Sequence, residues 1–436
     1  IYATGSKLVY KTAGIYARKA EWNANSGAGY PYDVQVTANT TLNYPNTGSG
    51  AFNTALGIAR DLAIDSGSSL YMDYGNGGNK SGSLTVGRNI VNSGSLSLGD
   101  FAGGDLSLGG SWTSSGTFIP NNRTVTFNGS DGNDQTINNP TTFDYLTINK
   151  TSTGNVVLAA SIIVNKDLTL TNKSIVLGNF NLTLPNKTSV ITSNANSYIA
   201  VLSPSTGKLI RQNVDNSADW IFPMGVAAAG RYAPITIKNL SGTTDLSMNV
   251  STSITPAVSD ATRVLSTKWF VTTTNNVTAN IYTEWQGVAA ETNSMTIPAT
   301  GSLATTIGGA PYTFYNINLV ANNTTATGVS LSNTAANGIV IGNDNAISIA
   351  NDECSGAINI TVDAAAVSGS NKGATSSSGF GASPCSSGSN SRDVWYKFTT
   401  SDEGSYKITV FKSTGTGAMS DPVLDLRSGT CAASVN

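Results

Sequence analysis

The stretch YLTINKTSTGNVVLAASIIVNKDLTLTNKSIVLGNFNLTL (Tyr145–Leu184) consists of short apolar triplets separated by Asn, Lys, Gly, Ser and Thr. The triplets recur at a constant distance, since Leu84 to Leu106 and Leu146 to Leu168 are each 22 residues apart. Self-similarity at a period near 20 residues is typical of a solenoid, in which each unit covers the apolar face of its neighbour. The repeat therefore predicts the fold of this part of the chain.

The repeat units show short strand patterns and no helical periodicity. A leucine-rich repeat would place a regular Asn or Cys among its leucines and return through a helix-like segment, and neither is present. We therefore predict a parallel β-helix over residues 34–202, with tight turns of Gly, Asn and Asp. A second apolar series runs through Ile137, Val157 and Val176. The inward side chains are expected to be Leu106, Val125, Leu146, Val157, Leu168 and Val176.

The solenoid is expected to begin before the clear repeats. Residues 33–42 alternate as a strand should, and residues 55–73 fit either a short amphipathic helix or further coils. The second interpretation is favoured because the stretch DLAI at 61–64 resembles DLSL at 105–108. Residues 1–33 are predicted to form a strand-rich cap, since the ends of a solenoid need covering.

The composition excludes several classes of chemistry. The 436 residues include no histidine, which excludes a serine or cysteine triad of the usual kind and a histidine-ligated catalytic zinc. Charged residues make up 11% of the chain and the net charge is −2, so no basic field points to nucleic acid or to an anionic membrane. No apolar run of the sequence is long enough for a membrane-spanning helix.

Some β-helices are polysaccharide-degrading enzymes, which need acidic clusters on one face. Four aspartates directly precede strands of the repeat, and equal phase would stack them in one column: Asp61, Asp105, Asp144 and Asp167. The favoured interpretation is that each caps its turn through the backbone. The alternative is a ladder that binds saccharide or cation.

The repeat ends near residue 203, and four strand-like segments with aromatic and β-branched alternation follow. Residues 203–345 are accordingly predicted to form an antiparallel β-sandwich. Its aromatic residues fit a hydrophobic core better than a sugar-binding platform, which is the alternative. They are Trp269, Tyr282, Trp285, Phe314 and Tyr315.

The last part of the chain carries the motifs NDECSGAI (351–358), DVWYKFT (393–399) and DPVLDLRSGTC (421–431). These motifs resemble the β-sandwich modules of large secreted bacterial surface proteins, akin to pre-peptidase C-terminal domains. The repeat stretch and the motif KWFVT (268–272) resemble the β-helix and the linking sandwich of the same proteins. Such proteins are typically cargo of the type IX secretion system of gliding bacteria. The resemblance implies an extracellular or cell-surface location and implies little about function.

Residues 346–436 are therefore expected to be a pre-peptidase-C-terminal-like β-sandwich module that is incomplete in this sequence. Of its three cysteines, Cys354 and Cys385 are predicted to pair, because the Gly- and Ser-rich segment between them needs a covalent link to become ordered. Cys431 is then left over. The acids at the two ends of the module could meet around calcium, although solvated or turn-capping acids are the favoured interpretation. These acids are Asp352, Glu353, Asp421 and Asp425.

Together these features predict an all-β protein, a parallel β-helix solenoid followed by antiparallel β-sandwich modules. The favoured function is that of a non-catalytic structural or adhesive surface protein, with a filament or surface fibre as one form. The alternatives are a carbohydrate-binding or carbohydrate-active β-helix and the accessory part of a larger secreted hydrolase. The expected partners are other copies of the chain, other surface proteins or surface polysaccharide. No cofactor other than calcium is expected.

Overall fold

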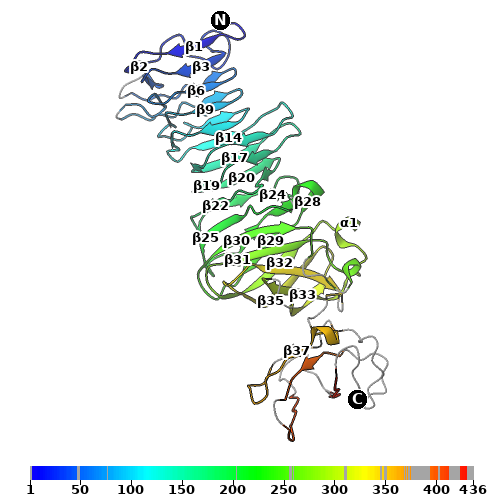
Figure 1. Cartoon of the computed structure of the whole chain (residues 1–436). Coiled ribbons are helices and arrows are strands. Elements are labelled where there is room, and N and C mark those ends of the chain that lie inside the picture. The colour runs from blue at the N-terminus through cyan, green and yellow to red at the C-terminus, as the bar shows by residue number, and fades with distance from the viewer. Residues whose placement is uncertain are drawn as a thin grey trace.

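In a computed structural model, the chain is an elongated β-protein with the N-terminus at one end (Figure 1). The structure describes residues 2–46, 50–75, 77–202, 204–254, 258, 260–308, 312–343, 346–347, 351–367, 369, 371, 374, 393–400, 403–411 and 423–429. The predicted fold class is confirmed, because a parallel β-solenoid is followed by antiparallel sheets. No helix among the described residues is long and apolar enough to cross a membrane.

Each complete coil of the solenoid contributes one short strand to each of three walls, and the first and last coils contribute to the first two walls. The first wall is an 11-stranded sheet, in which all neighbours are parallel except the last pair. Its strands, in order, are β1 (Lys7–Tyr10), β3 (Asp33–Val36), β6 (Leu62–Ile64), β9 (Ile90–Asn92), β12 (Trp112–Ser114), β15 (Gln135–Ile137), β18 (Val156–Leu158), β21 (Ile175–Val176), β24 (Ile199–Val201), β27 (Met224–Val226) and β28 (Arg231–Tyr232).

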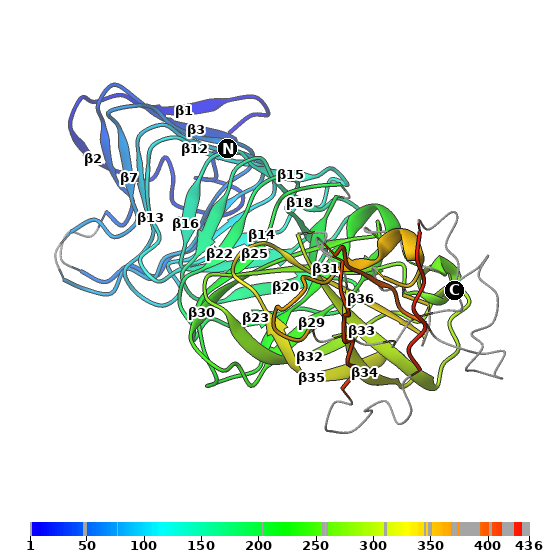
Figure 2. The same ribbon diagram turned by 60° about the horizontal axis from the view of Figure 1, so that its bottom comes forward.

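The second wall consists of two sheets that follow each other along the solenoid (Figure 2). Early coils supply a 5-stranded sheet of β2 (Ile15–Ala17), β4 (Thr41–Asn43), β7 (Ser69–Tyr71), β10 (Ser95–Ser97) and β13 (Thr117–Ile119). Later coils supply β16 (Thr141–Phe143), β19 (Ile162–Val164), β22 (Leu182–Leu184) and β25 (Leu209–Val214). At the change of sheet, the rings of Trp112, Phe118 and Phe143 pack in edge-to-face or tilted contacts with centroids 4.8–5.9 Å apart.

The third wall is a 7-stranded parallel sheet. It contains β5 (Leu56–Ile58), β8 (Leu84–Val86), β11 (Leu106–Leu108), β14 (Thr124–Phe127), β17 (Tyr145–Asn149), β20 (Leu168–Asn172) and β23 (Ile191–Thr192). The strands β5, β6 and β7 show that residues 55–73 form coils and no helix.

The period found in the sequence corresponds to stacking in register. Leu106 pairs with Leu84 on one side and Val125 on the other, and Leu146 pairs with Leu168. All of these side chains are at most 1% exposed. Inward stacking of equivalent apolar residues lets each coil cover the next, which is the source of most of the solenoid's stability.

The second apolar series was assigned to the wrong face at two positions. Ile137 points inward, but its partner in the next coil is Leu158, whereas Val157 pairs with Thr136. Val157 therefore lies on the outer face of the first wall, because a shift of one residue along a strand reverses the side chain. Val176 pairs with Val157 and lies in the same outer cluster, where Tyr198 covers it.

The parallel pairing extends beyond the boundaries expected at residues 33/34 and 202/203. Lys7 pairs with Asp33, so the segment expected to be a cap already supplies strands of the first coil. At the other end, Leu182 pairs with Leu209 and Ile199 pairs with Met224. A loop of residues 18–32 covers the start of the third wall, where the buried Trp22 donates its indole N–H to the Gly57 carbonyl at 2.8 Å.

The two antiparallel sheets enclose one shared core that includes Leu246, Trp269, Ile281 and Val329. One sheet has four strands, β26 (Trp220–Phe222), β29 (Ile235–Lys238), β32 (Val277–Glu284) and β35 (Asn323–Leu331). The other continues the second wall of the solenoid from β25 through β30 (Thr244–Ser251), β31 (Lys268–Thr273), β36 (Asn337–Asn343), β33 (Ala299–Ile307) and β34 (Thr313–Leu319). Helical segments are limited to Ala227–Ala229, Ala261–Arg263, α1 (Ala289–Thr292) and Cys354–Gly356 in the described residues.

Replacement of Leu146 by Ala is expected to destabilise the protein by about 2–5 kcal/mol, because the cavity lies between the buried side chains of Val125 and Leu168 in the neighbouring coils. The matched control is Thr147→Ala on the outer face of the same strand, for which a loss below about 1 kcal/mol is expected. Urea unfolding followed by circular dichroism measures both. Equal stabilities of the two variants would contradict the inward assignment of Leu146.

Candidate binding groove on the solenoid

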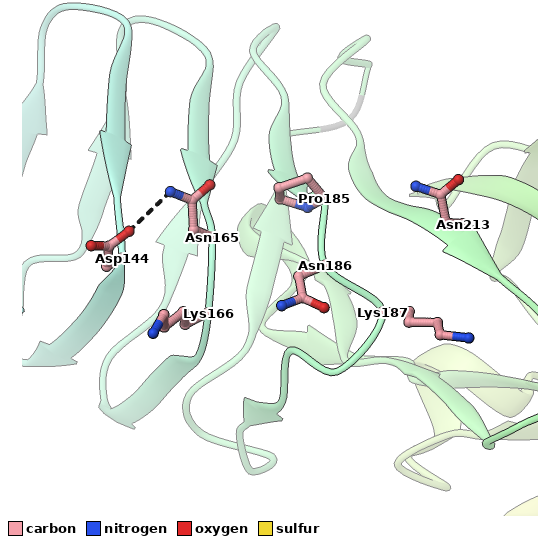
Figure 3. A pocket seen from close by; sticks show the side chains of 7 residues that line it. All are labelled: Asp144, Asn165, Lys166, Pro185, Asn186, Lys187 and Asn213. Atoms are coloured by element: carbon pink, nitrogen blue, oxygen red, sulfur yellow. Dashed lines mark hydrogen bonds between the residues drawn. The ribbon is translucent and has the colours of Figure 1, made fainter. Parts of the chain in front are cut away.

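The corner between the second and third walls carries a row of polar side chains. Each of these residues follows a second-wall strand, except Asn213, which is near the end of β25. Because the strands are paired in register, residues at the same distance after each strand reach the same corner. They line an open groove of about 580 Å³: Asp144, Asn165, Lys166, Pro185, Asn186, Lys187 and Asn213 (Figure 3). This volume is within the range of small-molecule sites.

Asp144 is a structural residue of the groove. Its carboxylate accepts a hydrogen bond from the Asn122 backbone N–H at 2.7 Å. It accepts a second one from the Asn165 side-chain amide at 2.9 Å, which Figure 3 shows. The two donors belong to the coils on either side of Asp144, so the carboxylate links three coils. Both of its oxygens are engaged, which suits a positioning role better than proton transfer.

Other polar groups of the groove are available to a ligand. Within the part of the chain that the structure describes, no hydrogen-bond partner reaches the Lys166 ammonium, the Asn186 side-chain N–H₂ group or the Asn213 side-chain amide. The Lys166 Nζ lies 5.4 Å from the centroid of the Tyr145 ring, which holds its alkyl chain against the wall. Along the groove, the amides can both donate and accept hydrogen bonds, and the ammonium group can donate them.

The charge of the groove is balanced. Lys187 forms an ion pair with Asp215, with Nζ and Oδ2 3.0 Å apart. Hydrogen bonds from Ser217 and Lys187 lower the pKa of Asp215 to about 2, so this carboxylate is ionised at neutral pH. Lys166 is offset by Asp144 in the same corner. The groove therefore favours a polar ligand without strong net charge.

The predicted column of four aspartates does not exist as one column. Asp61 precedes β6 of the first wall, whereas Asp105 and Asp167 precede β11 and β20 of the third wall. Asp105 and Asp167 are separated by the strands β14 and β17. Asp144 precedes β17 of the same wall but lies one position out of register with Asp105 and Asp167. The expectation failed because strands of both the first and the third wall can follow an aspartate, and the sequence does not say which wall a triplet belongs to.

The favoured backbone-capping role describes these aspartates better, although they bond to the neighbouring coil. Asp105 accepts the Thr124 N–H at 2.9 Å, and Asp167 accepts the Val190 N–H at 2.8 Å. A longer ladder of this kind follows the start of the first wall, where a side-chain oxygen of one coil accepts a backbone N–H of the next. In the following pairs the first residue accepts through its side-chain oxygen and the second donates its backbone N–H: Asp33 and Asp61 (3.1 Å), Asp61 and Asn89 (3.0 Å), Asn89 and Ser111 (2.9 Å), Asp134 and Asn155 (2.7 Å), and Asn155 and Ser174 (3.2 Å).

The aromatic residues of the sandwich mainly belong to the core. Trp269 is fully buried and donates its indole N–H to the Ala233 carbonyl at 2.9 Å, and Trp285 is 4% exposed. The partly buried Tyr315 accepts the Ser330 N–H at 3.0 Å, and Phe314 packs against the small cluster around Val340. Tyr282 donates its hydroxyl to Glu284 at 2.6 Å. These residues do not form one exposed platform.

The predicted sites of the terminal module are only partly within the described residues. Asp421, Cys385 and Cys431 lie outside them, so the Cys354–Cys385 pairing and the four-ligand calcium site stay predictions. Among the residues that are described, no three acidic, histidine or cysteine side chains come together as a metal site. Asp425 lies next to Arg427, with the carboxylate 2.8 Å from the guanidinium.

The sequence signal for the groove is the Asn-Lys pair that recurs after the second-wall strands. Asn165-Lys166 and Asn186-Lys187 are 21 residues apart, close to the period of the repeat. Of the four predicted aspartates, only Asp144 lines the groove. Asn213 gave no such signal, because it lies in a longer strand that continues into the sandwich.

A comparison with known families finds one match. Residues 350–422 are similar to a family described as galactose binding domain-like, which is associated with the type IX secretion system. No curated protein and no solved structure matches the chain. Within the matched segment, β37 (Ile358–Asn359) pairs in parallel with β38 (Tyr396–Lys397), and the Trp395 N–H donates to the Asn351 carbonyl at 2.8 Å.

The solenoid and this match together fit a surface protein of the type IX secretion class. The association of the matched domain with that system suggests a secreted or cell-surface protein. The match overlaps the predicted module at 346–436 and describes it as galactose-binding-like. The finer assignment to a pre-peptidase C-terminal-like module stays a prediction.

The hydrogen bond from the Asn89 N–H to the Asp61 carboxylate is expected to contribute stability that depends on pH. Burial raises the pKa of Asp61, but the Asn89 N–H and the Arg60 and Arg88 guanidiniums outweigh burial and hold the pKa below its ordinary value of 3.8. A lowered pKa contributes stability above the ordinary value that is lost as the pH falls through the folded-state pKa. At neutral pH, Asp61→Asn should therefore melt at a lower temperature than the wild type, and the difference should shrink below about pH 4.

Melting temperatures between about pH 7 and about pH 3 measure this effect. The matched control is Asp363→Asn, at an exposed position outside the ladder. A difference between Asp61→Asn and wild type that stays constant over this range would show that the charge of Asp61 does not stabilise the fold.

Proposed function

We propose that the chain is a non-catalytic adhesive arm of a type IX-exported surface protein, in which the solenoid and sandwich hold a carbohydrate-binding terminal module away from the cell. One observation carries the proposal. The 9-stranded sheet runs without interruption from the solenoid wall into the sandwich, because β25 pairs with β22 in parallel and with β30 in the antiparallel direction. The two parts share backbone hydrogen bonds, so the joint has no flexible linker.

A second connection at the joint supports a stiff arm. The hairpin β27–β28 ends the first wall, and its Arg231 side chain reaches into the sandwich. The guanidinium donates to the Ser266 carbonyl and, at 3.0 Å, to the Ala290 carbonyl, and it lies 3.8 Å from the Glu291 carboxylate. Glu291 is fully buried and also accepts from the Thr267 hydroxyl at 3.0 Å. Removal of one member would leave a buried charge without its partner.

A non-catalytic role is supported by the chemistry of the chain. Histidine, the commonest general base, is absent from the sequence. The Asp144 carboxylate in the groove has both oxygens engaged in hydrogen bonds with neighbouring coils. The similarity of residues 350–422 to a galactose-binding-like domain points to glycans as the adhesion target.

Two measurements on the purified chain test this proposal. Small-angle X-ray scattering should give one elongated particle whose maximum dimension is the same at low and high salt. Beads coated with the chain should adhere to a galactan-coated surface, and free galactose should compete. No reducing ends should be released from the galactan. Release of reducing sugar, or scattering from a chain with a mobile joint, would contradict the proposal.

Assembly of copies into a fibre is a second candidate, favoured by the open edges at the N-terminal end. Within the described residues, β1 pairs only with β3, and β2 pairs only with β4. The Ser6 and Tyr10 carbonyls accept from Asp33 and Thr37, so Val9 presents its backbone groups to the open side. An unpaired strand edge can add a strand from another chain.

Val9→Pro is expected to abolish assembly without unfolding the coil, because the proline removes an N–H on the open side only. Sedimentation velocity at increasing concentration should show association for the wild type and monomers for the variant. The control is Ile15→Ser, which removes an exposed apolar side chain on β2 and leaves the backbone N–H groups in place. A proline in a strand that is paired on both sides, such as Val91→Pro in β9, would instead break pairing inside the solenoid. A wild type that stays monomeric at the highest concentration would exclude this candidate.

A further inference from the structure

The groove has a periodicity that a ligand can match. Thr141, Ile162, Leu182 and Leu209 are equivalent in register on β16, β19, β22 and β25. Four residues after each of them stand Tyr145, Lys166, Asn186 and Asn213, and the last three line the groove, one from each successive coil. Neighbouring strands are about 4.8 Å apart, so polar groups repeat at this distance along the groove.

The chemistry of the groove excludes several ligand classes. Lys166 and Lys187 are balanced by Asp144 and Asp215, so the groove lacks the positive field that binds nucleic acid or strongly anionic polymers. An extended peptide cannot add as a strand here, because β19, β22 and β25 are each paired on both sides. A ligand must therefore be recognised through side chains.

A linear sugar chain fits these conditions. Its hydroxyl groups both donate and accept, as do the side-chain amides of Asn165, Asn186 and Asn213, and its pyranose units repeat at a distance comparable to the spacing of the coils. The ring of Pro185 offers an apolar surface for one face of a sugar ring. The sandwich closes one end of the groove, where the Asn213 N–H donates to Asp245 of β30 at 2.8 Å.

We propose that this groove binds a neutral linear polysaccharide along the solenoid axis, with about one sugar unit for each coil. The proposal rests on the proposed adhesive function and adds a second glycan site, distinct from the terminal module. It gives the arm a contact that grows with the length of the bound chain. The Asp144 carboxylate positions the Asn165 amide for this contact.

The test uses the full chain and two double variants. Lys166→Ala/Asn213→Gly removes two groups that are free to bind a ligand, and glycine retains the positive φ of 55° at position 213. Lys11→Ala/Asn239→Gly is the matched control, because Lys11 and Asn239 are exposed, lie outside the groove, and Asn239 also has a positive φ of 50°. Circular dichroism melting verifies that both variants are folded.

The probes are soluble mannan, xylan, galactan and mixed-linkage β-glucan, together with alginate and single-stranded DNA as anionic probes. Affinity electrophoresis selects the neutral polysaccharide that binds, and calorimetry with its oligosaccharides measures affinity against length. We expect affinity to rise until the oligosaccharide spans the four coils that line the groove. Lys166→Ala/Asn213→Gly should weaken binding at least about tenfold, and the control should stay within about twofold of the wild type.

Other outcomes would overturn the proposal. Equal binding by both double variants would show that the polysaccharide binds outside the groove. If free galactose then competes, the binding site is the terminal module, and the proposed adhesive function stands without the groove. Binding that does not depend on oligosaccharide length would exclude the axial arrangement. Binding of only alginate or DNA, or of none of the probes, would exclude a neutral polysaccharide as the ligand of the groove. This conclusion would not depend on whether small-angle X-ray scattering shows a stiff arm.

Discussion

Backbone pairing between successive coils is the interaction on which the rest of this structure depends. Each strand of the solenoid is only two to six residues long, as β21 and β25 show, and no strand of this length is stable alone. Stacking in register pairs its N–H and C=O groups on both sides and brings leucines such as Leu84, Leu106 and Leu168 into the interior. The same arrangement leaves the two ends of the stack as places where pairing must stop.

The two ends are treated differently. At the C-terminal end, β25 and the hairpin β27–β28 carry the pairing into antiparallel strands, so two walls end in regular hydrogen bonds. At the N-terminal end, the loop of residues 18–32 covers the third wall, and buried Arg18 fixes it by donating to the Trp22 carbonyl at 2.8 Å and to the Tyr44 carbonyl. Among the described residues, β1 and β2 are the first strands of the first and second walls, and each is paired on one side.

Much of the architecture followed from the sequence because stacking in register repeats the same residue type at the same phase. The pairs Leu84–Leu106 and Leu146–Leu168 were found in this way. The method failed at Val157, where adjacent apolar residues make both faces of the strand equally apolar, so the period alone did not fix the inward face. It also failed for the aspartate column, because Asp61 and Asp105 open strands of different walls with the same local pattern.

The groove was harder to find from the sequence because it is defined by a corner between walls. Asn165 and Asn186 look like ordinary turn residues, and only the three-dimensional register shows that their side chains share a face. The length of each turn between strands varies along the chain. Equivalent corner residues are therefore found by counting from the end of the preceding strand. A fixed repeat length does not predict which residues share a corner.

The joint and the groove depend on the same irregularity in β25. Its pairing with β30 shifts between Arg211 and Val214, so one extra residue is accommodated at Asn213, which adopts the left-handed conformation that asparagine tolerates. Beneath this bulge, the Arg211 guanidinium donates to the Ser189 carbonyl at 3.0 Å, and burial lowers the pKa of Arg211 to about 10. The bulge lets the strand leave the solenoid for the sandwich and turns the Asn213 side chain outward, into the groove. A change that straightened β25 would therefore alter the direction of the arm and the shape of its binding surface together.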